Sequence, residues 1–407
     1  MYTSSLYVRS PVWLQNIILS VRALARQRLR EGQRSCMLGS KLIENEKSVD
    51  SLANFSSDKL SEVLRSAVSS VPFYKSLDAV DISALNSFPI ISKKDIRSKP
   101  MAFQSAKVPR VIVKGATSGT TGSPLSIPQS MESVVREQAF ITRSLNWADF
   151  KKGDRRAWLR GDMIVPQGQK SGPFWRYSYF EDMILLSSFH MTTAALPGYI
   201  QAMLDYKVDV IQAYPSSIVT LAKYLASCDE YYPGKIKSVL TSSESLSAED
   251  RQLVEERFRC KVFDWYGLFE RVAAIASCEH GNYHVLTDYA HVEFLDVGDG
   301  RHEIVGTNFN NNYYPLIRYK TGDHVILSKE TECPCGRVYP MVERIEGRVG
   351  DYLIGEDGQK VHILNHISKG IVGLLGCQFV QDKPRELDVL AVVDRAVFDA
   401  LQEKQLI

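Results

Sequence analysis

The 407-residue sequence predicts an α/β fold, in which a large layered α/β N-terminal domain with a β-rich portion precedes a small α+β C-terminal domain. Three observations support this prediction. From about residue 56 to 290, apolar strand-like runs alternate with amphipathic helix-like segments, as in parallel sheets covered by helices. From 284 to 327 the pattern changes to closely spaced short strands. The chain is also longer than one hydrophobic core usually allows, so a second domain is expected.

The elements follow from local signals. Residues 1–55 are polar-rich with helical spacing and are expected to form a helical extension. Val111–Val113 is a short apolar strand, and Ser130 is a suitable N-cap for a helix that continues to Ala148. Further predicted strands are 208–211, 237–240, 284–286, 291–294, 302–305 and 386–393, and further predicted helices are 216–226, 247–258 and 395–404.

Composition limits the class of partner and the compartment. The formal net charge is only +2, with 44% hydrophobic and 24% charged residues, so we expect no nucleic-acid partner. No apolar run approaches the roughly 20 residues that span a bilayer. The N-terminus also lacks the basic, apolar and small-residue sequence of a secretory signal. We therefore expect a cytoplasmic protein.

The segment Thr117–Pro124 reads Thr-Ser-Gly-Thr-Thr-Gly-Ser-Pro and is the strongest functional signal in the chain. Glycines let the backbone approach anionic oxygens closely, and successive N–H groups then form a concave donor surface. Hydroxyls add further donors, so the segment is typical of a polyphosphate-binding loop. The Gly-Lys-Ser/Thr ending of a Walker A loop is absent. A flexible Ser/Thr/Gly linker is the alternative interpretation.

Three later turns each carry one charged side chain that could meet a nucleotide. Glu270 could bind a magnesium ion, Asp323 the ribose hydroxyls, and Arg348 the phosphate or ribose oxygens. Taken singly, such residues are more often ordinary turn or packing residues. Their order and spacing make the set specific. The three turns are Tyr266–Glu270, Tyr319–Asp323 and Gly347–Asp351.

Together with Thr117–Pro124, these turns resemble the adenylate-forming acyl-activating superfamily. Within it, the chain is similar to the phenylacetate–CoA ligase-like branch, which includes CapK-type proteins of capsular polysaccharide synthesis and F390-synthetase-like proteins. The resemblance extends from about residue 55 to 390. Supporting segments are 66–74, 88–97 and 213–217.

The resemblance implies roles for individual residues. The loop hydroxyls would hold the β- and γ-phosphates, Glu270 would coordinate magnesium, Asp323 would hold the ribose, and Arg348 would act from a hinge. The catalytic residues implied are Thr120, Glu270 and Arg348. The nucleotide-binding residues implied are Thr117, Ser118, Gly119, Thr120, Thr121, Gly122, Ser243, Glu244, Tyr266, Gly267, Glu270, Asp323 and Arg348.

The reaction implied has two steps. A carboxylic acid attacks the α-phosphorus of ATP to give an acyl-adenylate and pyrophosphate, and CoA or an amine then displaces AMP. The amine could be an amino sugar, in polysaccharide or cell-surface glycan synthesis. The acid is not readable from the sequence. Tyr214–Ser216, Trp265 and the aromatic-rich run 161–190 are candidate walls of its pocket, although aromatic residues at this density are usually core.

The resemblance also divides the chain into an extension (1–55), an adenylation domain (56–350) and a small domain (351–407), with Asp351 as the hinge. The family's small domain normally carries a lysine that contacts the acid and ATP. Lys404 lacks the usual Gly-Lys setting, so this domain is expected to be incomplete. A nucleotide-binding protein that does not adenylate is therefore the alternative function.

Three of the seven cysteines form a pattern with a histidine. Cys278 and His284, followed about fifty residues later by Cys333 and Cys335, suit a closed tetrahedral zinc site of structural type. Similar proteins carry a comparable arrangement. His280 competes with His284 for the fourth position, and free cysteines in a loop are the alternative. The site would pin two loops beside the nucleotide. The remaining cysteines, expected to be buried, are Cys36, Cys228, Cys260 and Cys377.

Apolar residues recur at helical spacing between Trp13 and Leu24, with arginines close by. A basic amphipathic helix of this kind can lie on an anionic membrane surface, so that peripheral membrane association is one hypothesis. Packing of the apolar face on the protein's own domain is the commoner outcome and is the prediction here.

Overall fold

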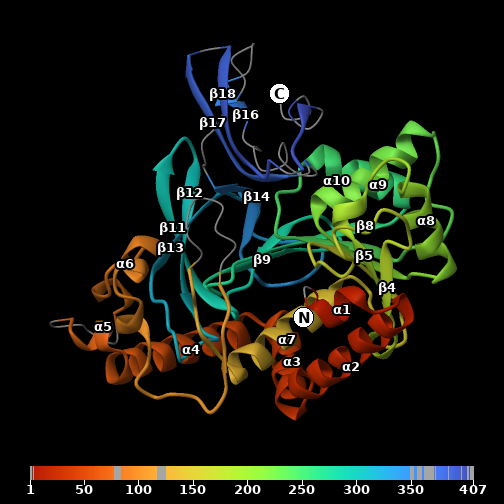
Figure 1. Cartoon of the computed structure of the whole chain (residues 1–407). Coiled ribbons are helices and arrows are strands. Elements are labelled where there is room, and N and C mark those ends of the chain that lie inside the picture. Colours follow the sequence, from red (N-terminus) through yellow and green to blue (C-terminus); the bar gives the residue numbers. More distant parts are fainter. Residues whose placement is uncertain are drawn as a thin grey trace. The chain divides into compact units, whose positions relative to one another are not determined.

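The computed structural model describes residues 2, 4–77, 84–116, 125–348, 353–354, 360–361, 371, 373–383, 385–395, 397–400 and 403. The chain divides into two compact units, residues 1–347 and 348–407. Figure 1 shows the large unit as a long central sheet with helices on both of its faces. The predicted α/β class is confirmed.

The central sheet has twelve strands, and five neighbours within it are parallel. They lie in the order β5 (Met183–Ser187), β3 (Arg156–Arg160), β6 (Val210–Ala213), β7 (Ser238–Ser242) and β8 (Lys261–Gly267). All five residues of β5 are buried, as expected for a strand that is covered on both faces. The edge strand β4 (Trp175–Ser178) pairs antiparallel with β5.

Helices that follow these strands bury the sheet. Leu159, Ile184 and Ile211 from the sheet are fully buried in one cluster with Tyr199 and Leu221 from the helices. Burial of each such side chain contributes about 1.5–3 kcal/mol. The helices are α8 (Leu196–Asp205), α9 (Pro215–Ser227) and α10 (Ala248–Phe258). The alternation predicted between residues 208 and 258 is therefore present, with ends that differ by at most two residues.

The remaining half of the sheet is the predicted β-rich portion. Strands pair antiparallel in β8–β9, β9–β10, β10–β14, β11–β12 and β12–β13. The order continues from β8 through β9, β10, β14 and β13 to β12 and β11. Their bounds are β9 Ala274–Ser277, β10 Tyr283–Val285, β11 Ala290–Gly298, β12 Arg301–Asn308, β13 Tyr319–Leu327 and β14 Met341–Arg348.

Residues 1–55 are largely helical, as predicted, and belong to the large unit; the last of these helices continues to Ser70. The helices are α1 (Ser5–Arg9), α2 (Val12–Arg30), α3 (Gln33–Asn45) and α4 (Val49–Ser70). Helix α2 covers the edge strand β4. Asn16 Oδ1 accepts a 3.0 Å hydrogen bond from Tyr177 N, and Ser20 Oγ accepts one of 2.9 Å from Tyr179 N. These contacts pair backbone groups that an open sheet edge would expose.

Between α4 and β3 the chain forms short elements and one long helix. Ser130 caps this helix, α7 (Met131–Trp147), by accepting a hydrogen bond from Ser133 N, which confirms the predicted cap. Among the residues that the structure describes, no helix is both long and apolar enough to cross a membrane. The short elements are α5 (Pro72–Lys75), α6 (Lys93–Ser98), β1 (Ile112–Val113) and β2 (Gln129–Ser130).

The second unit contains two antiparallel strand pairs among its described residues. Strand β15 (Leu353–Ile354) pairs with β16 (Lys360–Val361), and β17 (Leu374–Lys383) pairs with β18 (Glu386–Val393). Strand β18 has the predicted bounds. The predicted helix 395–404 begins later, because 395 and 397 form turns and the described helical residues are 400 and 403.

Candidate functional site

Several of the residues singled out in the sequence lie at the carboxyl edge of the parallel strands. Arg160 ends β3, Tyr214 follows β6, Ser243 follows β7 and Gly267 ends β8. Loops at this edge of an open α/β sheet form the usual ligand site, because each strand there gives way to a loop whose polar groups face the same side. The fold therefore gathers segments that are far apart in the sequence.

Ser243 stands in a strained backbone conformation at this edge. Its φ of +73° lies in the left-handed region, which favours glycine. The hydroxyl accepts a 2.8 Å hydrogen bond from Arg160 Nη2. The Arg160 guanidinium also lies 4.9 Å from the Trp158 ring and 5.0 Å from the Tyr214 ring. Three strand ends are thus linked by one arginine.

Glu244 orients the neighbouring helix. Its Oε2 accepts a 2.9 Å hydrogen bond from Ser216 N, in the first turn of α9. A carboxylate at a helix N-terminus is favoured both by the unpaired N–H groups there and by the helix dipole. Close by, a Cβ added to Gly347 would lie 3.4 Å from Ser245 Oγ. The start of the predicted hinge segment therefore lies beside the segment predicted to line the adenine.

Tyr266 and Asp323 form a hydrogen-bonded pair. Tyr266 Oη donates to Asp323 Oδ2 at 2.8 Å, across 57 residues of sequence. Burial and the Asp323 carboxylate raise the pKa of the Tyr266 hydroxyl well above its usual value, so it remains a donor. Thr321 Oγ1 accepts from Asp323 N at 3.0 Å and fixes the backbone that carries the carboxylate. The segment Tyr319–Asp323 was predicted as a turn but is the start of β13, where the pairing with β12 is irregular. Tyr266 and Asp323 are thus held at predicted nucleotide-contact positions.

Glu270 is held by hydrogen bonds from Tyr319 and Asn308. Only 4% of the residue is exposed, and its Oε1 accepts a 3.2 Å hydrogen bond from Tyr319 Oη. Asn308 Nδ2 donates to its backbone carbonyl at 3.4 Å. Because a buried carboxylate is costly without partners, this environment favours a donor or a cation beside it. A carboxylate is a hard oxygen ligand of the kind that Mg²⁺ prefers.

The predicted phosphate loop lies outside the described residues, so the positions of Thr117, Ser118, Gly119, Thr120, Thr121 and Gly122 are not part of the observed site. Its base is described. Ala116 bridges Ser126, and Ile127 N donates to Gly115 O at 3.1 Å, which closes the two ends of the loop. The side chain of Arg348, the last residue of β14, also lies outside the described part.

The loop base touches the segment that carries Glu270. A Cβ added to Gly115 would lie only 2.3 Å from the Phe269 ring, so only glycine allows this approach without rearrangement. Gln129 Nε2 donates to Phe269 O at 3.3 Å. The base of the predicted phosphate loop and the predicted magnesium ligand are therefore neighbours.

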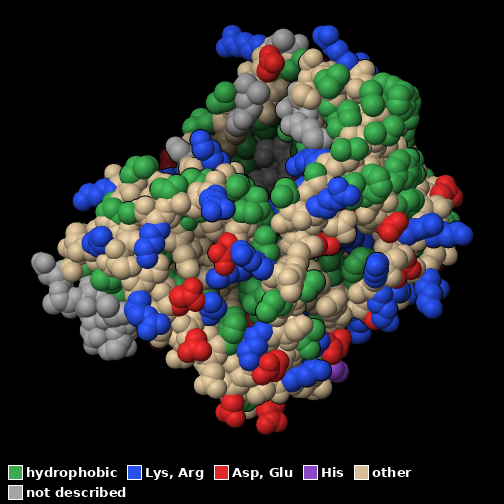
Figure 2. Space-filling view, turned by 90° about the horizontal axis from the view of Figure 1, so that it is seen from below, with side chains coloured by type: hydrophobic (Ala, Val, Ile, Leu, Met, Phe, Trp, Pro, Cys, Tyr) green, Lys and Arg blue, Asp and Glu red, His purple; other side chains and the backbone are tan. Residues whose placement is uncertain are grey.

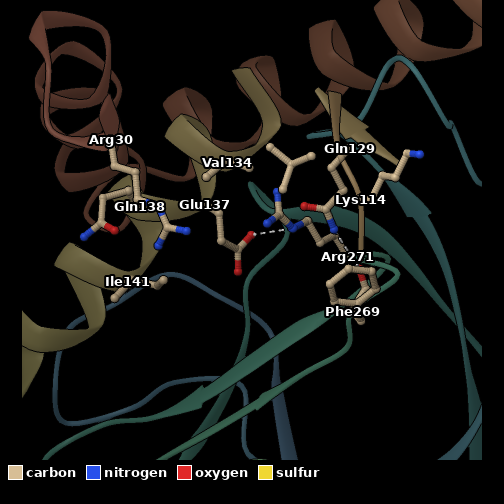
Figure 3. Close-up of a pocket in the computed structure, with 10 residues that line it drawn as sticks. Arg30, Lys114, Gln129, Val134, Glu137, Gln138, Ile141, Phe269 and Arg271 are labelled. Atoms are coloured by element: carbon tan, nitrogen blue, oxygen red, sulfur yellow. Dashed lines mark hydrogen bonds and ion pairs between the residues drawn. The ribbon is translucent and has the colours of Figure 1, made fainter. Parts of the chain in front are cut away.

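A cavity of about 160 Å³ opens beside Phe269, and Figure 3 shows its lining. Arg271 Nε lies 3.4 Å from Glu137 Oε2, and the two side chains point toward each other in Figure 3. Arg30, the last residue of α2, reaches the same cavity. Its residues are Arg30, Val113, Lys114, Gln129, Val134, Glu137, Gln138, Ile141, Phe269 and Arg271. None of the walls suggested by sequence, Tyr214–Ser216, Trp265 and residues 161–190, lines this cavity.

The four predicted zinc ligands come together. Their ligand atoms all lie within 4.8 Å of one another, with Cys278 Sγ 3.7 Å from Cys333 Sγ and Cys335 Sγ 3.4 Å from His284 Nε2. A tetrahedral zinc ion at about 2.3 Å from each sulfur would separate the sulfurs by about 3.8 Å. Burial lowers the pKa of His284 to about 4, so its imidazole is neutral at pH 7, as a ligand requires.

His284 rather than His280 completes this set. The chain turns at Cys278–Gly281, which leaves His280 exposed at the tip of the hairpin and returns His284 on β10. One prediction about this cluster was wrong. Gly267 pairs with Ala274, and Cys278 lies four residues further along, about 13 Å from the carboxyl edge. The cluster therefore joins loops at the opposite end of these strands, away from the nucleotide-contact positions.

The prediction that the other cysteines are buried was wrong for Cys36 and Cys228, which are exposed. Cys260 and Cys377 are partly buried, and Cys260 packs against the core of the parallel sheet. Sequence analysis missed Arg160, Tyr319 and Arg271 as partners of the site. The position of Tyr319 inside the predicted turn Tyr319–Asp323 was the one signal that could have found it.

Comparison with known proteins gives a consistent set of relatives. No family model matches the chain. The chain is 23% identical over 356 residues to Protein CapK of Staphylococcus aureus, which covers 86% of this chain and 78% of CapK. It is 24% identical over 329 residues to phenylacetate-coenzyme A ligase of Pseudomonas putida, covering 75% of this chain and 73% of the ligase.

The fold is also found among solved structures. The chain matches 2-hydroxyisobutyryl-CoA ligase in complex with 2-HIB-AMP and CoA, in an open conformation, with a TM-score of 0.56 and 18% identity over 85% of this chain and 86% of the ligase. The same enzyme in its thioesterification state gives a TM-score of 0.57 and 19% identity, with 86% and 80% covered. At this identity the likeness concerns the fold.

Proposed function

We propose that this chain, which belongs with the phenylacetate–CoA ligase-like adenylate-forming proteins, activates a carboxylic acid with ATP and transfers the acyl group to CoA. The observation that carries the proposal is the pairing of Tyr266 with Asp323 and of Tyr319 with Glu270 beside the base of the glycine-rich loop. Each pair joins two segments that the sequence selected independently as nucleotide-contact turns.

The proposed chemistry has two displacements. The acid's carboxylate attacks the α-phosphorus of ATP, a new acyl–oxygen–phosphorus link forms, and pyrophosphate leaves. The CoA thiol then attacks the acyl carbon, its proton is lost, and AMP leaves. Neither step requires a nucleophilic side chain, so catalysis depends on alignment and on charge neutralisation at phosphorus.

The described residues supply positioning for this chemistry. Asp323, oriented by Tyr266 and by the Thr321 hydroxyl, would accept hydrogen bonds from the ribose hydroxyls. Ser243 and Glu244 would line the adenine, while Gly267 leaves room at the end of β8. The loop hydroxyls, with Thr120 central among them, would donate to the β- and γ-phosphates. Arg348 would add a positive charge from the hinge.

Magnesium would be held by Glu270 together with phosphate oxygens. A bound ion would neutralise phosphate charge, which is the chemistry that this step needs. The protein's own contribution is to fix the carboxylate through Tyr319 and to exclude water around it, since the residue is almost fully buried.

The cavity beside Phe269 would take the body of the acid. Phe269 and Arg271 flank Glu270 in sequence and both line it, so a carboxylate at its mouth would lie close to the phosphates. Three basic residues, Arg30, Lys114 and Arg271, face one acidic residue, Glu137, which gives the lining a net charge of 3 − 1 = +2. A positive lining attracts the anionic acid.

CoA is the acceptor favoured by the ligase relatives. An amine acceptor in surface polysaccharide synthesis is the variant of the same proposal, and it rests on the resemblance to CapK-type proteins noted from the sequence. Both acceptors would react with the same acyl-adenylate. ATP and CoA are supplied in the cytoplasm, which is where this reaction would take place.

The Cys278–His284–Cys333–Cys335 cluster would hold a zinc ion that stabilises the fold. Four protein ligands leave no open position for a substrate, so the role would be structural. The Glu279–Arg337 ion pair at 2.6 Å joins the same two loops and orients the cluster.

The decisive experiment is ATP–pyrophosphate exchange with a panel of carboxylic acids, followed by detection of the acyl-CoA product by mass spectrometry. Acid-dependent exchange supports adenylation, and thioester formation selects CoA over amines. Exchange without thioester formation, but with acylated amino sugar, selects the amine acceptor. ATP binding without exchange for any acid would contradict the proposal and favour a nucleotide-binding protein.

A further inference from the structure

Helix α2 exposes its apolar side. Trp13, Ile17 and Val21 recur every four residues, so they lie on one face of the helix, and they are 63%, 45% and 57% exposed. No part of the chain that the structure describes covers these three side chains. We call the set Trp13, Ile17 and Val21 the N-terminal apolar face.

The same helix packs on the protein through a largely polar side. Gln15, Asn16 and Ser20 are buried, with Leu19 and Ala23, against β4 and its flanks. Gln15 Nε2 donates to Tyr7 O at 2.9 Å, and Arg176 Nε donates to Gln15 Oε1. Fixed hydrogen bonds to the sheet edge therefore set the rotation of α2. Trp13, Ile17 and Val21 are thereby held outward, while Leu14, Ile18 and Leu24 are partly buried.

The charge that the N-terminal segment itself contributes to this face is of one sign. Residues 1–30 contain five arginines and no aspartate or glutamate. Arg9 ends α1, and Arg28 lies seven residues after Val21, on the same side of α2. Arg9, Arg26 and Arg28 are exposed. Seen from below, the side that carries the N-terminal helices, hydrophobic and basic side chains both reach the surface (Figure 2).

We propose that the N-terminal apolar face binds the surface of an anionic lipid bilayer, with α2 lying parallel to it. Apolar side chains would enter the interface, Trp13 would sit at the headgroup level, and the arginines would contact lipid phosphates. The inference is independent of the ligase activity proposed above. It would place a cytoplasmic acyl-activating site next to a membrane.

A lipid surface fits this face better than a second copy of the chain. A self-complementary contact would bring the arginines of both copies together with no acidic residue from this segment to offset them. A bilayer that contains phosphatidylglycerol supplies the missing negative charge. Arginine also binds phosphate in a bidentate manner.

The test is co-sedimentation of the full chain with vesicles of phosphatidylcholine alone and with vesicles that also contain phosphatidylglycerol. We expect binding only to the anionic vesicles, and weaker binding at high ionic strength. Arg9→Gln and Arg28→Gln should each weaken it about fivefold. Trp13→Ala combined with Ile17→Ser should abolish it, because the apolar contribution is lost.

Met101→Ser is the matched control, since this side chain is also exposed and apolar but lies outside the face. It should bind as the parent does, and all variants should keep the parent's thermal unfolding temperature and its ATP–pyrophosphate exchange in the absence of vesicles. The proposal is overturned if the chain binds both kinds of vesicle equally well, or if it binds neither. So does an oligomer in analytical ultracentrifugation that Trp13→Ala with Ile17→Ser dissociates, because the face would then be a subunit contact.

Discussion

Tyr319 Oη donates a 3.2 Å hydrogen bond to Oε1 of Glu270, across 49 residues of sequence. This bond joins the first residue of β13 to the turn that follows β8, and it lies next to the base of the glycine-rich loop. A buried carboxylate that is fixed by a phenol, beside a loop suited to phosphates, is the feature on which the proposed magnesium role depends.

Glu270→Gln should reduce magnesium-dependent turnover by about a hundredfold or more while the fold survives, because glutamine keeps the acceptor for Tyr319 but loses the charge. The measurement is a magnesium titration of ATP–pyrophosphate exchange together with thermal unfolding. Tyr319→Phe is the control that removes only the hydrogen bond. A loss of thermal stability that accounts for the lost turnover would make Glu270 a structural residue.

Asp323→Asn should weaken ATP binding by about tenfold or more, because a charge-assisted hydrogen bond contributes about 1.5–3 kcal/mol. The parent should prefer ATP over 2′,3′-dideoxy-ATP, and the variant should lose most of that preference. Calorimetric titration with both nucleotides measures this. Tyr266→Phe keeps the Asp323 carboxylate but removes its 2.8 Å hydrogen-bond donor. Its preference for ATP over 2′,3′-dideoxy-ATP should therefore lie between that of the parent and that of Asp323→Asn. An unchanged preference in Asp323→Asn would remove the ribose role.

Ser243→Gly and Ser243→Ala should differ in stability. Both lose the 2.8 Å bond to Arg160, at about 1 kcal/mol, but glycine also relieves the left-handed conformation, at about 1–2 kcal/mol. Denaturant unfolding should therefore find the glycine variant close to the parent and the alanine variant about 1 kcal/mol less stable. Equal loss in both variants would show that the positive φ is not a source of strain.

Metal analysis of the purified chain should find about one zinc per chain. Removal by a chelator should lower the thermal unfolding temperature, because the ion joins the 278–284 hairpin to the 333–336 turn. Cys335→Ser should bind less zinc, whereas Cys228→Ser, at an exposed position outside the cluster, should bind as much as the parent. Zinc-free protein that was never exposed to a chelator would contradict the site.

Local signals account for the parts that the sequence predicted well. Ser130 caps α7 because a hydroxyl before a helix reaches the N–H groups of its first turn whatever the rest of the chain does. The alternation around 208–258 predicted parallel strands because strand and helix periods are local properties of the chain. Likewise, glycine-rich and charged turns indicate phosphate chemistry through residue type alone.

Long-range contacts determine the features of the site that the sequence did not predict. Whether His280 or His284 joins the cysteines depends on where the hairpin turns, and the cavity lined by Arg30 and Arg271 depends on how α2 meets α7. Neither is encoded in local spacing.

The sequence by itself determined the α/β class and indicated the candidate nucleotide-contact segments and the three cysteines of the metal set, because these follow from periodicity and side-chain chemistry. Only the tertiary structure decided that Tyr266 meets Asp323 and that Tyr319 meets Glu270, since strand order and register bring them together. It also decided that Trp13 faces outward. The apolar spacing of α2 predicts burial of that face, but Asn16 and Ser20 accept hydrogen bonds from Tyr177 N in the edge strand and from Tyr179 N just after it, and these bonds hold the polar side inward.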